Sequence, residues 1–193
     1  MDKLKKTDLL SLEEYDKQRE DIKKDLLSHK KNRSVLIGDN VVLLFEDYLT
    51  IKYQVQEMLR IEKIFNQKEI QEEIDAYSSL IPDGDNLKAT MLIMYPDVDE
   101  RKIMLNKLHN LENLIWLSID GSKKIIAVSD EDLERTRDEK TSAVHFLRFQ
   151  LSDIDKKSFK ETDDISIGIE HKEYGFETKL QKDTASALAK DLD

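Results

Sequence analysis

The sequence of 193 residues contains no cysteine. This absence excludes disulfide bonds, thiolate nucleophiles, cysteine-ligated iron–sulfur clusters and cysteine zinc sites. Any redox role would therefore need a bound cofactor or a partner protein.

Glycine and proline are also scarce, with five glycines and two prolines in the chain. The glycines do not have the spacing of a dinucleotide-binding fingerprint or of a phosphate-binding P-loop. No glycine-rich or proline-rich linker divides the chain. We therefore predict that residues 1–193 form a single domain without a nucleotide site of either common type.

Histidine occurs four times, and no histidine lies in a Glu-x-x-His or a His-Glu-x-x-His pattern. The spacing of potential ligands thus offers no support for a metal site, which would have to assemble from residues that are distant in the sequence. Long apolar runs are missing as well, because no stretch of about 18 consecutive apolar residues occurs. The N-terminus lacks the apolar core and cleavage site of a secretory signal. A cytoplasmic protein with no membrane contact is the expectation.

Charged residues, by contrast, make up 37% of the chain, and the formal net charge is -10. An acidic surface repels phosphate backbones, so nucleic acid is not an expected partner. Only residues 1–33 carry an excess of positive charge, with ten basic against eight acidic residues, a net of +2.

Hydrophobic periodicity predicts an α+β fold with an antiparallel or mixed sheet, built from hairpins and covered by about four to five helices. Residues 1–33 are expected to contain an N-terminal helix, over 8–28, that leads to a basic end, and residues 184–192 a closing helix. Further helices are expected over 48–65 and 68–80, from residue 97 onward, and over 153–159. Strands are expected at 34–37, 41–45, 87–95, 114–119, 124–128, 144–151, 165–170 and 176–180.

The segment LLFEDYLTIKYQVQEMLRIEKIF at 43–65 is the most legible part of the chain. The unbroken apolar run VVLLF at 41–45 predicts a central strand that is buried on both faces. On the helix that follows, Tyr53, Glu57 and Arg60 share one face. This face is either a binding surface or a solvated ion pair, and we favour the solvated ion pair.

Three other places carry candidate binding residues. His145 lies in the middle of a strand and alternates with Arg148, which points to the opposite face; a hydrogen-bonded core histidine is favoured over a ligand or proton-transfer role. Lys88 lies on a largely apolar strand, so it needs an edge position or an acidic partner. The basic cluster of the first helix either binds an anion or complements the helix dipole, and we favour the dipole. The cluster consists of His29, Lys30, Lys31 and Arg33.

At these stretches the chain resembles the bacterial family catalogued as domain of unknown function 3501. The resemblance covers most of the chain and rests on HKKNR at 29–33, the segment at 43–65, IQEEIDAYSSLIPDGDNLKATMLIMYPD at 70–97 and EDLERTRDEKTSAVHFLRFQL at 131–151. The family has no established activity. The resemblance implies an oxidative-stress or redox context, with rubrerythrin-like or iron–sulfur oxidoreductase-like proteins as partners.

Two functions follow as hypotheses. The first is an accessory or regulatory protein of the cytoplasm that binds a partner from such a redox system. The alternative is a metal-dependent or acid–base enzyme with a site near His145, Glu57 and Arg60. The sequence identifies neither a cofactor nor a substrate.

Overall fold

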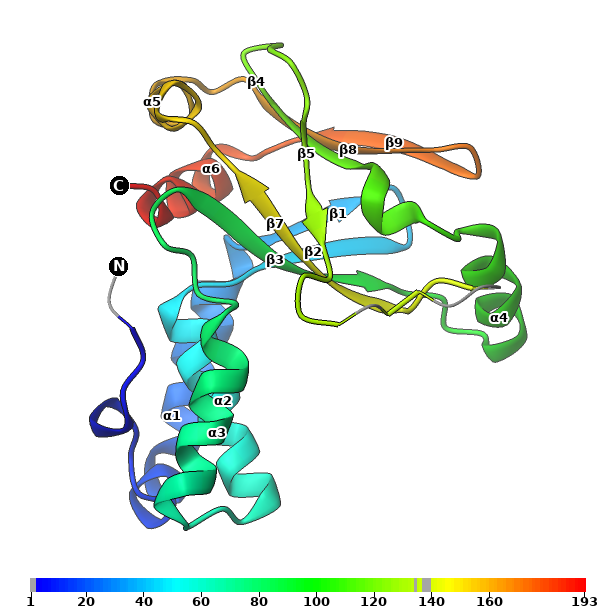
Figure 1. The fold of residues 1–193 in the computed structure, drawn as a ribbon. Helices are drawn as coiled ribbons and strands as arrows, with labels where there is room; N and C mark the ends of the chain where they lie inside the picture. Colours follow the sequence, from blue (N-terminus) through cyan, green and yellow to red (C-terminus); the bar gives the residue numbers. More distant parts are fainter. Residues whose placement is uncertain (1–2, 134, 137–139) are drawn as a thin grey trace.

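The computed structural model describes residues 3–133, 135–136 and 140–193, and these residues form an α+β fold (Figure 1). Two antiparallel sheets make up one part. A helical unit of α1 (Leu12–Lys31), α2 (Tyr48–Glu62) and α3 (Gln67–Ser78) extends from them. The predicted fold class is confirmed, and the structure adds that the strands divide into two sheets.

The first sheet has the order β1-β2-β3-β7-β6, and the second has the order β5-β4-β8-β9. The strands of the first sheet are β1 (Ser34–Ile37), β2 (Val41–Phe45), β3 (Asn86–Ile93), β7 (Val144–Gln150) and β6 (Val128–Ser129). Those of the second are β5 (Ile125–Ile126), β4 (Ile115–Ile119), β8 (Ile165–His171) and β9 (Tyr174–Lys179). The single strand expected at 124–128 is thus two short strands, one in each sheet.

Side-chain caps fix where the helices of the helical unit begin. The Ser11 hydroxyl accepts the amide of Glu14, and the Glu14 carboxylate accepts the amide of Ser11, which is a capping box at the start of α1. At the start of α2, the Asp47 carboxylate accepts the amide of Thr50 at 2.9 Å. Lys63, with φ of 55°, ends this helix in the left-handed conformation.

Hydrogen bonds of Tyr174, on β9, connect the β1–β2 hairpin to the second sheet. The Tyr174 hydroxyl donates to the carbonyl of Ile37 at 2.7 Å and accepts the amide of Asn40 at 2.8 Å. Gly38 has a φ of +63°, and a Cβ atom there would lie 2.7 Å from the tyrosine oxygen. Glycine is therefore required at this turn by its conformation and by the space available.

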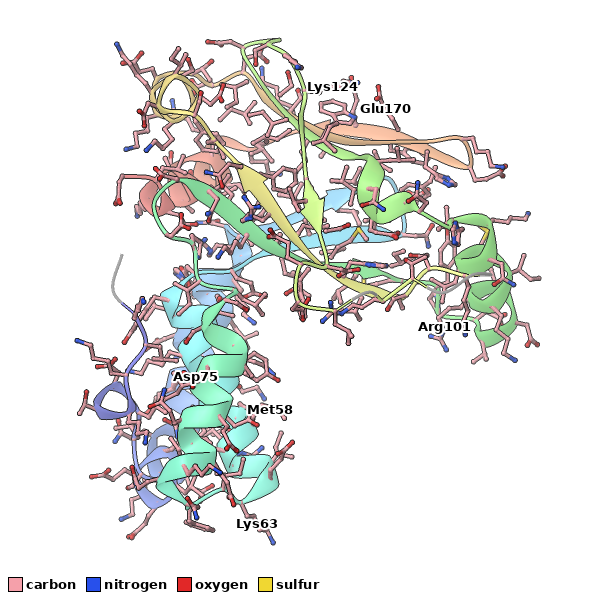
Figure 2. All side chains as sticks on the ribbon, in the orientation of Figure 1. Met58, Lys63, Asp75, Arg101, Lys124 and Glu170 are labelled. Carbon is pink, nitrogen blue, oxygen red and sulfur yellow. The ribbon has the colours of Figure 1, made fainter. Side chains whose placement is uncertain are left out.

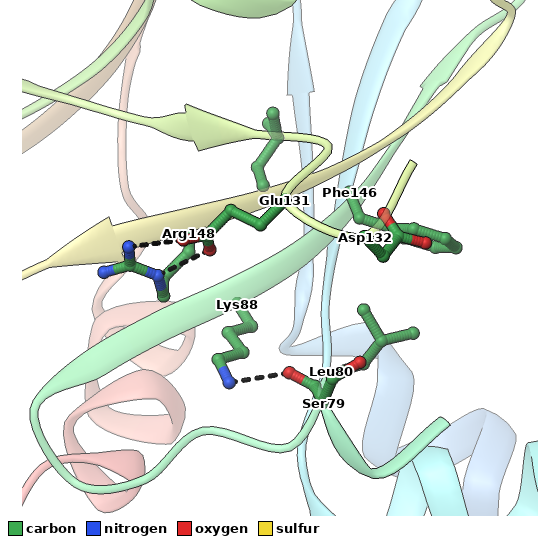
Figure 3. Close-up of a pocket in the computed structure, with 8 residues that line it drawn as sticks. Ser79, Leu80, Lys88, Glu131, Asp132, Phe146 and Arg148 are labelled. Carbon is green, nitrogen blue, oxygen red and sulfur yellow. Dashed lines mark hydrogen bonds and ion pairs between the residues drawn. The ribbon is translucent and has the colours of Figure 1, made fainter. Parts of the chain in front are cut away.

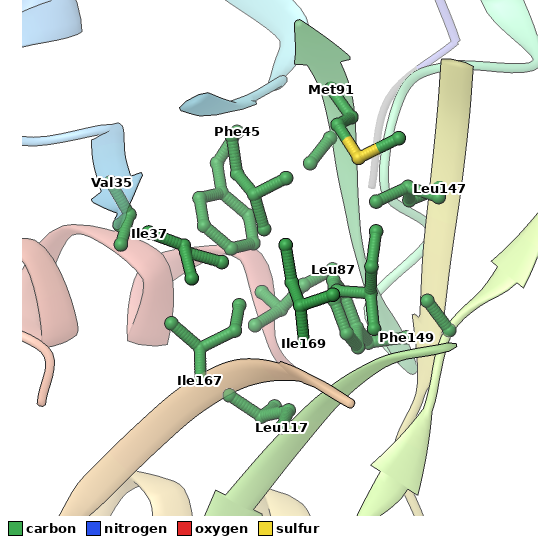
Figure 4. Close-up of a cluster of buried hydrophobic side chains, with 14 of the residues drawn as sticks. Val35, Ile37, Phe45, Leu87, Met91, Leu117, Leu147, Phe149, Ile167 and Ile169 are labelled. Carbon is green, nitrogen blue, oxygen red and sulfur yellow. The ribbon is translucent and has the colours of Figure 1, made fainter. Parts of the chain in front are cut away.

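The main hydrophobic core lies between the two sheets (Figure 4). Alternate residues of β2 face it, namely Val41, Leu43 and Phe45, while Val42 and Leu44 are only half-buried. The expectation that VVLLF is buried on both faces was wrong, although its central position is confirmed. The aromatic ring of Phe45 lies 6.3 Å from that of Phe149 on β7, and such pairs add to the packing of the core.

The helical unit has a second core of its own, centred on Ile51, Val55, Leu59 and Ile74. Its far end, near Met58 and Lys63, lies away from both sheets (Figure 2). The other helices are α4 (Val98–Lys107), α5 (Asp153–Glu161) and α6 (Lys182–Leu188), with short 3-10 helices η1 (Lys6–Asp8), η2 (Leu111–Leu114) and η3 (Ala189–Asp191). Within the described ranges, no helix is both long and apolar enough to span a membrane.

Candidate functional site

Glu57 of α2 points toward α1 and is buried, with 8% of its surface exposed. Its carboxylate accepts the Tyr15 hydroxyl at 2.7 Å and the Nε and Nη2 groups of Arg19 at 2.7 and 3.0 Å. Arg60, one helical turn away, donates through Nη2 at 3.2 Å. The favoured interpretation of Tyr53, Glu57 and Arg60 as a solvated face was therefore wrong for Glu57.

The arrangement holds Glu57 in its charged form. Hydrogen bonding from the Arg19 guanidinium lowers the pKa of this carboxyl to about 2, against the opposing effect of burial. Burial and the neighbouring carboxylate both raise the pKa of the Tyr15 hydroxyl. With its lone pairs engaged by three donor side chains, Glu57 is poorly placed to act as a general base or a metal ligand.

Beside this cluster, a groove of about 410 Å³ runs between α1 and α2. Its volume is in the range of small-ligand sites. The wall is largely apolar, and the rim includes Leu49, of which 52% is exposed. The groove residues are Leu10, Tyr15, Gln18, Ile22, Asp25, Leu26, His29, Leu49, Lys52, Tyr53 and Gln56. Two candidate residues, Tyr53 and His29, thus meet in one concave surface.

At one end of the groove, His29 belongs to a chain of charged groups. Its Nε2 atom lies 2.5 Å from a carboxylate oxygen of Asp47, and Arg33 Nη1 lies 3.4 Å from the same oxygen. The buried Arg33 also donates to the carbonyls of Phe45 and Glu46 at 3.1 and 3.0 Å, and to the carboxylate of Asp191. Burial raises the pKa of Asp191 to about 6, although Arg33 opposes the shift.

These bonds separate the members of the basic cluster at 29–33. The Arg33 guanidinium lies inside the protein, where its hydrogen bonds connect the end of α1 to β2 and to the C-terminal segment. Lys30 and Lys31 lie in the last turn of α1, as the interaction of cations with the helix dipole predicts. Only His29 of the four lines the groove.

Lys88 and Arg148 face each other across β3 and β7 and line a smaller pocket of about 150 Å³ (Figure 3). The Lys88 ammonium donates to the carbonyls of Ser79 and Ile81 at 2.7 and 3.0 Å, just beyond α3. Arg148 binds both carboxylate oxygens of Glu131, at 2.7 and 2.8 Å. Lys88 therefore lies on an interior strand and caps α3, instead of lying at an edge or pairing with an acid.

His145 is completely buried, as the alternation of β7 predicts. Its Nδ1 atom lies 2.5 Å from Asp130, and its Nε2 atom lies 2.8 Å from the hydroxyl of Thr141. Glu57, by contrast, bonds within the described part of the chain only to residues of the helical unit. The structure thus places His145 and Glu57 in separate clusters, so the two residues do not share a site. Among the residues the structure describes, no group of three or more His, Asp or Glu side chains is placed to hold a metal ion.

Several residues of these clusters were not among the candidate residues predicted from the sequence. Arg19 left a signal, because it interrupts the apolar stripe of the first helix and so needed a buried acidic partner. No sequence signal marked Asp130, Glu112 or Asp191, since each of them contacts its partner only in the tertiary fold.

The fold and the groove define an α+β protein with two facing antiparallel sheets and a helical unit that carries an open concave surface. The chain belongs to the family described as Protein of unknown function (DUF3501), whose model matches residues 3–192. It is similar to a crystal structure at 1.90 Å resolution of a novel protein of unknown function from Burkholderia pseudomallei K96243, with 46% identity, a TM-score of 0.95 and complete coverage of both chains. A comparison with curated proteins found no match.

Proposed function

We propose that this protein is a non-catalytic accessory or regulatory protein of the cytoplasm that binds a partner protein in the α1–α2 groove. The observation that supports the proposal most is the contrast between open and closed sites. The groove is open and largely apolar, whereas the residues suited to acid–base chemistry, Glu57 and His145, are buried and already paired. A concave apolar surface of this kind is the usual form of a recognition site.

The redox context implied by the resemblance indicates the kind of partner. A rubrerythrin-like or iron–sulfur oxidoreductase-like protein would carry the redox centre, because a chain without cysteine cannot ligate an iron–sulfur cluster through thiolates. The volume of the groove suits one or two large side chains better than a whole helix. We therefore expect the partner to insert a short segment with an apolar side chain, and we expect the rim residue Leu49 to contribute to the contact.

The experiment measures binding of a purified rubrerythrin-like protein from the same organism by titration calorimetry. Leu49→Lys should weaken binding by about tenfold or more, because it places a charge in an apolar contact. Leu27→Lys is the matched control, since Leu27 has a similar exposed fraction, 56% against 52% for Leu49, and lies on α1 outside the groove. This control should bind as the unmodified protein does.

Two results would contradict the proposal. One is equal binding by the two lysine variants. The other is robust turnover by the isolated protein together with a stoichiometric metal in elemental analysis, which would favour a metal-dependent or acid–base enzyme instead. Loss of activity in a His145→Gln variant that is still folded would then point to His145 as part of that enzyme.

A further inference from the structure

The hydrogen bonds around His145 specify where its protons lie. Nδ1 faces a carboxylate oxygen of Asp130 at 2.5 Å. Nε2 faces the main-chain carbonyl oxygen of Ser142 at 3.1 Å and the hydroxyl of Thr141 at 2.8 Å. A carbonyl oxygen can only accept a hydrogen bond. Nε2 must therefore carry a hydrogen to satisfy Ser142.

The surroundings of Asp130 specify the proton on Nδ1 of His145. The other oxygen of Asp130 accepts Arg135 Nη1 at 3.1 Å and the amide of Phe146 at 3.0 Å. A carboxyl group that receives these donors is held as the carboxylate, which has no hydrogen to donate. Nδ1 must therefore be the donor to Asp130.

Thr141 does not change this assignment. Its hydroxyl has a single hydrogen, and Glu112 takes it at 2.9 Å. The hydroxyl of Thr136 donates to the second oxygen of Glu112 at 2.5 Å. Glu112 thus accepts from two hydroxyls as a carboxylate, and the Thr141 oxygen is left to accept from Nε2 of His145.

We propose that His145 is held as the doubly protonated imidazolium, and that it acts as a pH-sensitive clasp joining β7 to η2 and to the described parts of the 130–142 connection. The charges of the cluster favour a cation at this position. Arg135 pairs with Asp132 at 2.7 Å and with Asp130 at 3.1 Å. Glu112 lies 3.9 Å from His145, and Met91 on the neighbouring strand β3 is apolar. Without the imidazolium, one arginine would face three carboxylates, and a buried charge without a partner is strongly unfavourable.

Loss of the extra proton would open the clasp. A ring nitrogen without its hydrogen would turn a lone pair toward the Asp130 carboxylate or the Ser142 carbonyl, at 2.5 to 3.1 Å. The contact would change from attraction to repulsion. The bond from the Phe146 amide to Asp130 lies in the same cluster and would weaken with it, so this amide reports on the clasp.

Nitrogen-15 NMR of the histidine rings in the full chain tests the proposal directly. At neutral pH both ring nitrogens of His145 should show the resonance of a protonated nitrogen, and as the pH is raised the Phe146 amide should exchange about tenfold faster than intrinsic exchange alone predicts. An unprotonated ring nitrogen at neutral pH would overturn the proposal. So would protection of the Phe146 amide that does not change when His145 loses its proton.

Glu112→Gln provides a second measurement with little change in shape. Removal of one carboxylate charge should move the ring nitrogens of His145 toward the resonance of an unprotonated nitrogen at neutral pH. Ring resonances of His145 that do not change in this variant would contradict the role of Glu112 in holding the imidazolium. If this variant does not fold, the ring spectrum of the unmodified protein still decides the question.

Discussion

The Glu57 and His145 clusters solve the same physical problem in different parts of the molecule. Each buries a carboxylate with cationic partners. The Glu57 cluster lies between two helices, and its arginines remain partly exposed beside the groove. The His145 cluster is closed, with an imidazole that is completely buried. A buried carboxylate can thus be paired either beside an open groove, where water reaches its partners, or inside a closed cluster, where its imidazole partner has no contact with water.

The largest expected effect is the loss of the His145 ring. His145→Ala should reduce the free energy of unfolding by about 3–5 kcal/mol, because Asp130 is left buried without the imidazole. Urea unfolding measures the change, with His109→Ala as the control because His109 is exposed. If the free energy of unfolding falls no more in His145→Ala than in His109→Ala, the prediction for the buried ring is contradicted.

A smaller effect is expected in the helical unit. Glu57→Ala should lower the free energy of unfolding by about 2 kcal/mol, since the buried Tyr15 hydroxyl loses its acceptor while water can reach the arginines. The exposed Glu62 lies on the same helix and supplies the control, Glu62→Ala, for which a change within about 0.5 kcal/mol is expected. If Glu57→Ala and His145→Ala lower the free energy of unfolding equally, the partial exposure of the arginines around Glu57 does not reduce the cost of removing the carboxylate.

A third comparison concerns the pH dependence of stability, where Glu57 and Asp191 act in opposite directions. Glu57 has a folded-state pKa of about 2, below the ordinary value of 4.5. Its contribution is complete above pH 4.5 and is lost as the pH falls toward 2. In Glu57→Gln the unfolding free energy should therefore fall less steeply over this range than in the unmodified protein.

Asp191 has a pKa raised from 3.8 to about 6. The folded state binds the proton more tightly, so the contribution is largest below pH 3.8 and is lost as the pH rises toward 6. Asp191→Asn should remove this decline from the urea unfolding profile. A decline between these pH values that persists in the variant would contradict the assignment to Asp191.

Local chemistry made much of the fold predictable. The apolar runs at 34–37 and 41–45 predicted the two strands of the β1–β2 hairpin with their observed bounds, whereas the helix expected over 8–28 begins later, at Leu12, after the Ser11 cap. The division of one expected strand around Ala127 was not predictable, since only the two facing sheets require it. The helix expected from residue 97 onward is α4, and its apolar residues Val98 and Ile103 are exposed instead of joining a core.

The candidate sites were predictable only in part. The i, i+3 spacing of Glu57 and Arg60 identified a real pair, and the alternation of β7 placed His145 on the buried face. The partners that decide what these residues do come from distant segments. Tyr15 is 42 positions from Glu57, and Asp130 is 15 positions from His145 across a charged connection. No local pattern encodes such contacts.

The most direct test of the account compares partner affinity in one variant from each region, at a temperature at which both are folded. Tyr53→Ala changes the groove, and His145→Gln changes the sealed cluster. The account predicts that binding of the rubrerythrin-like protein weakens by about tenfold or more for Tyr53→Ala and stays unchanged for His145→Gln. Weakened binding in His145→Gln alone would contradict it.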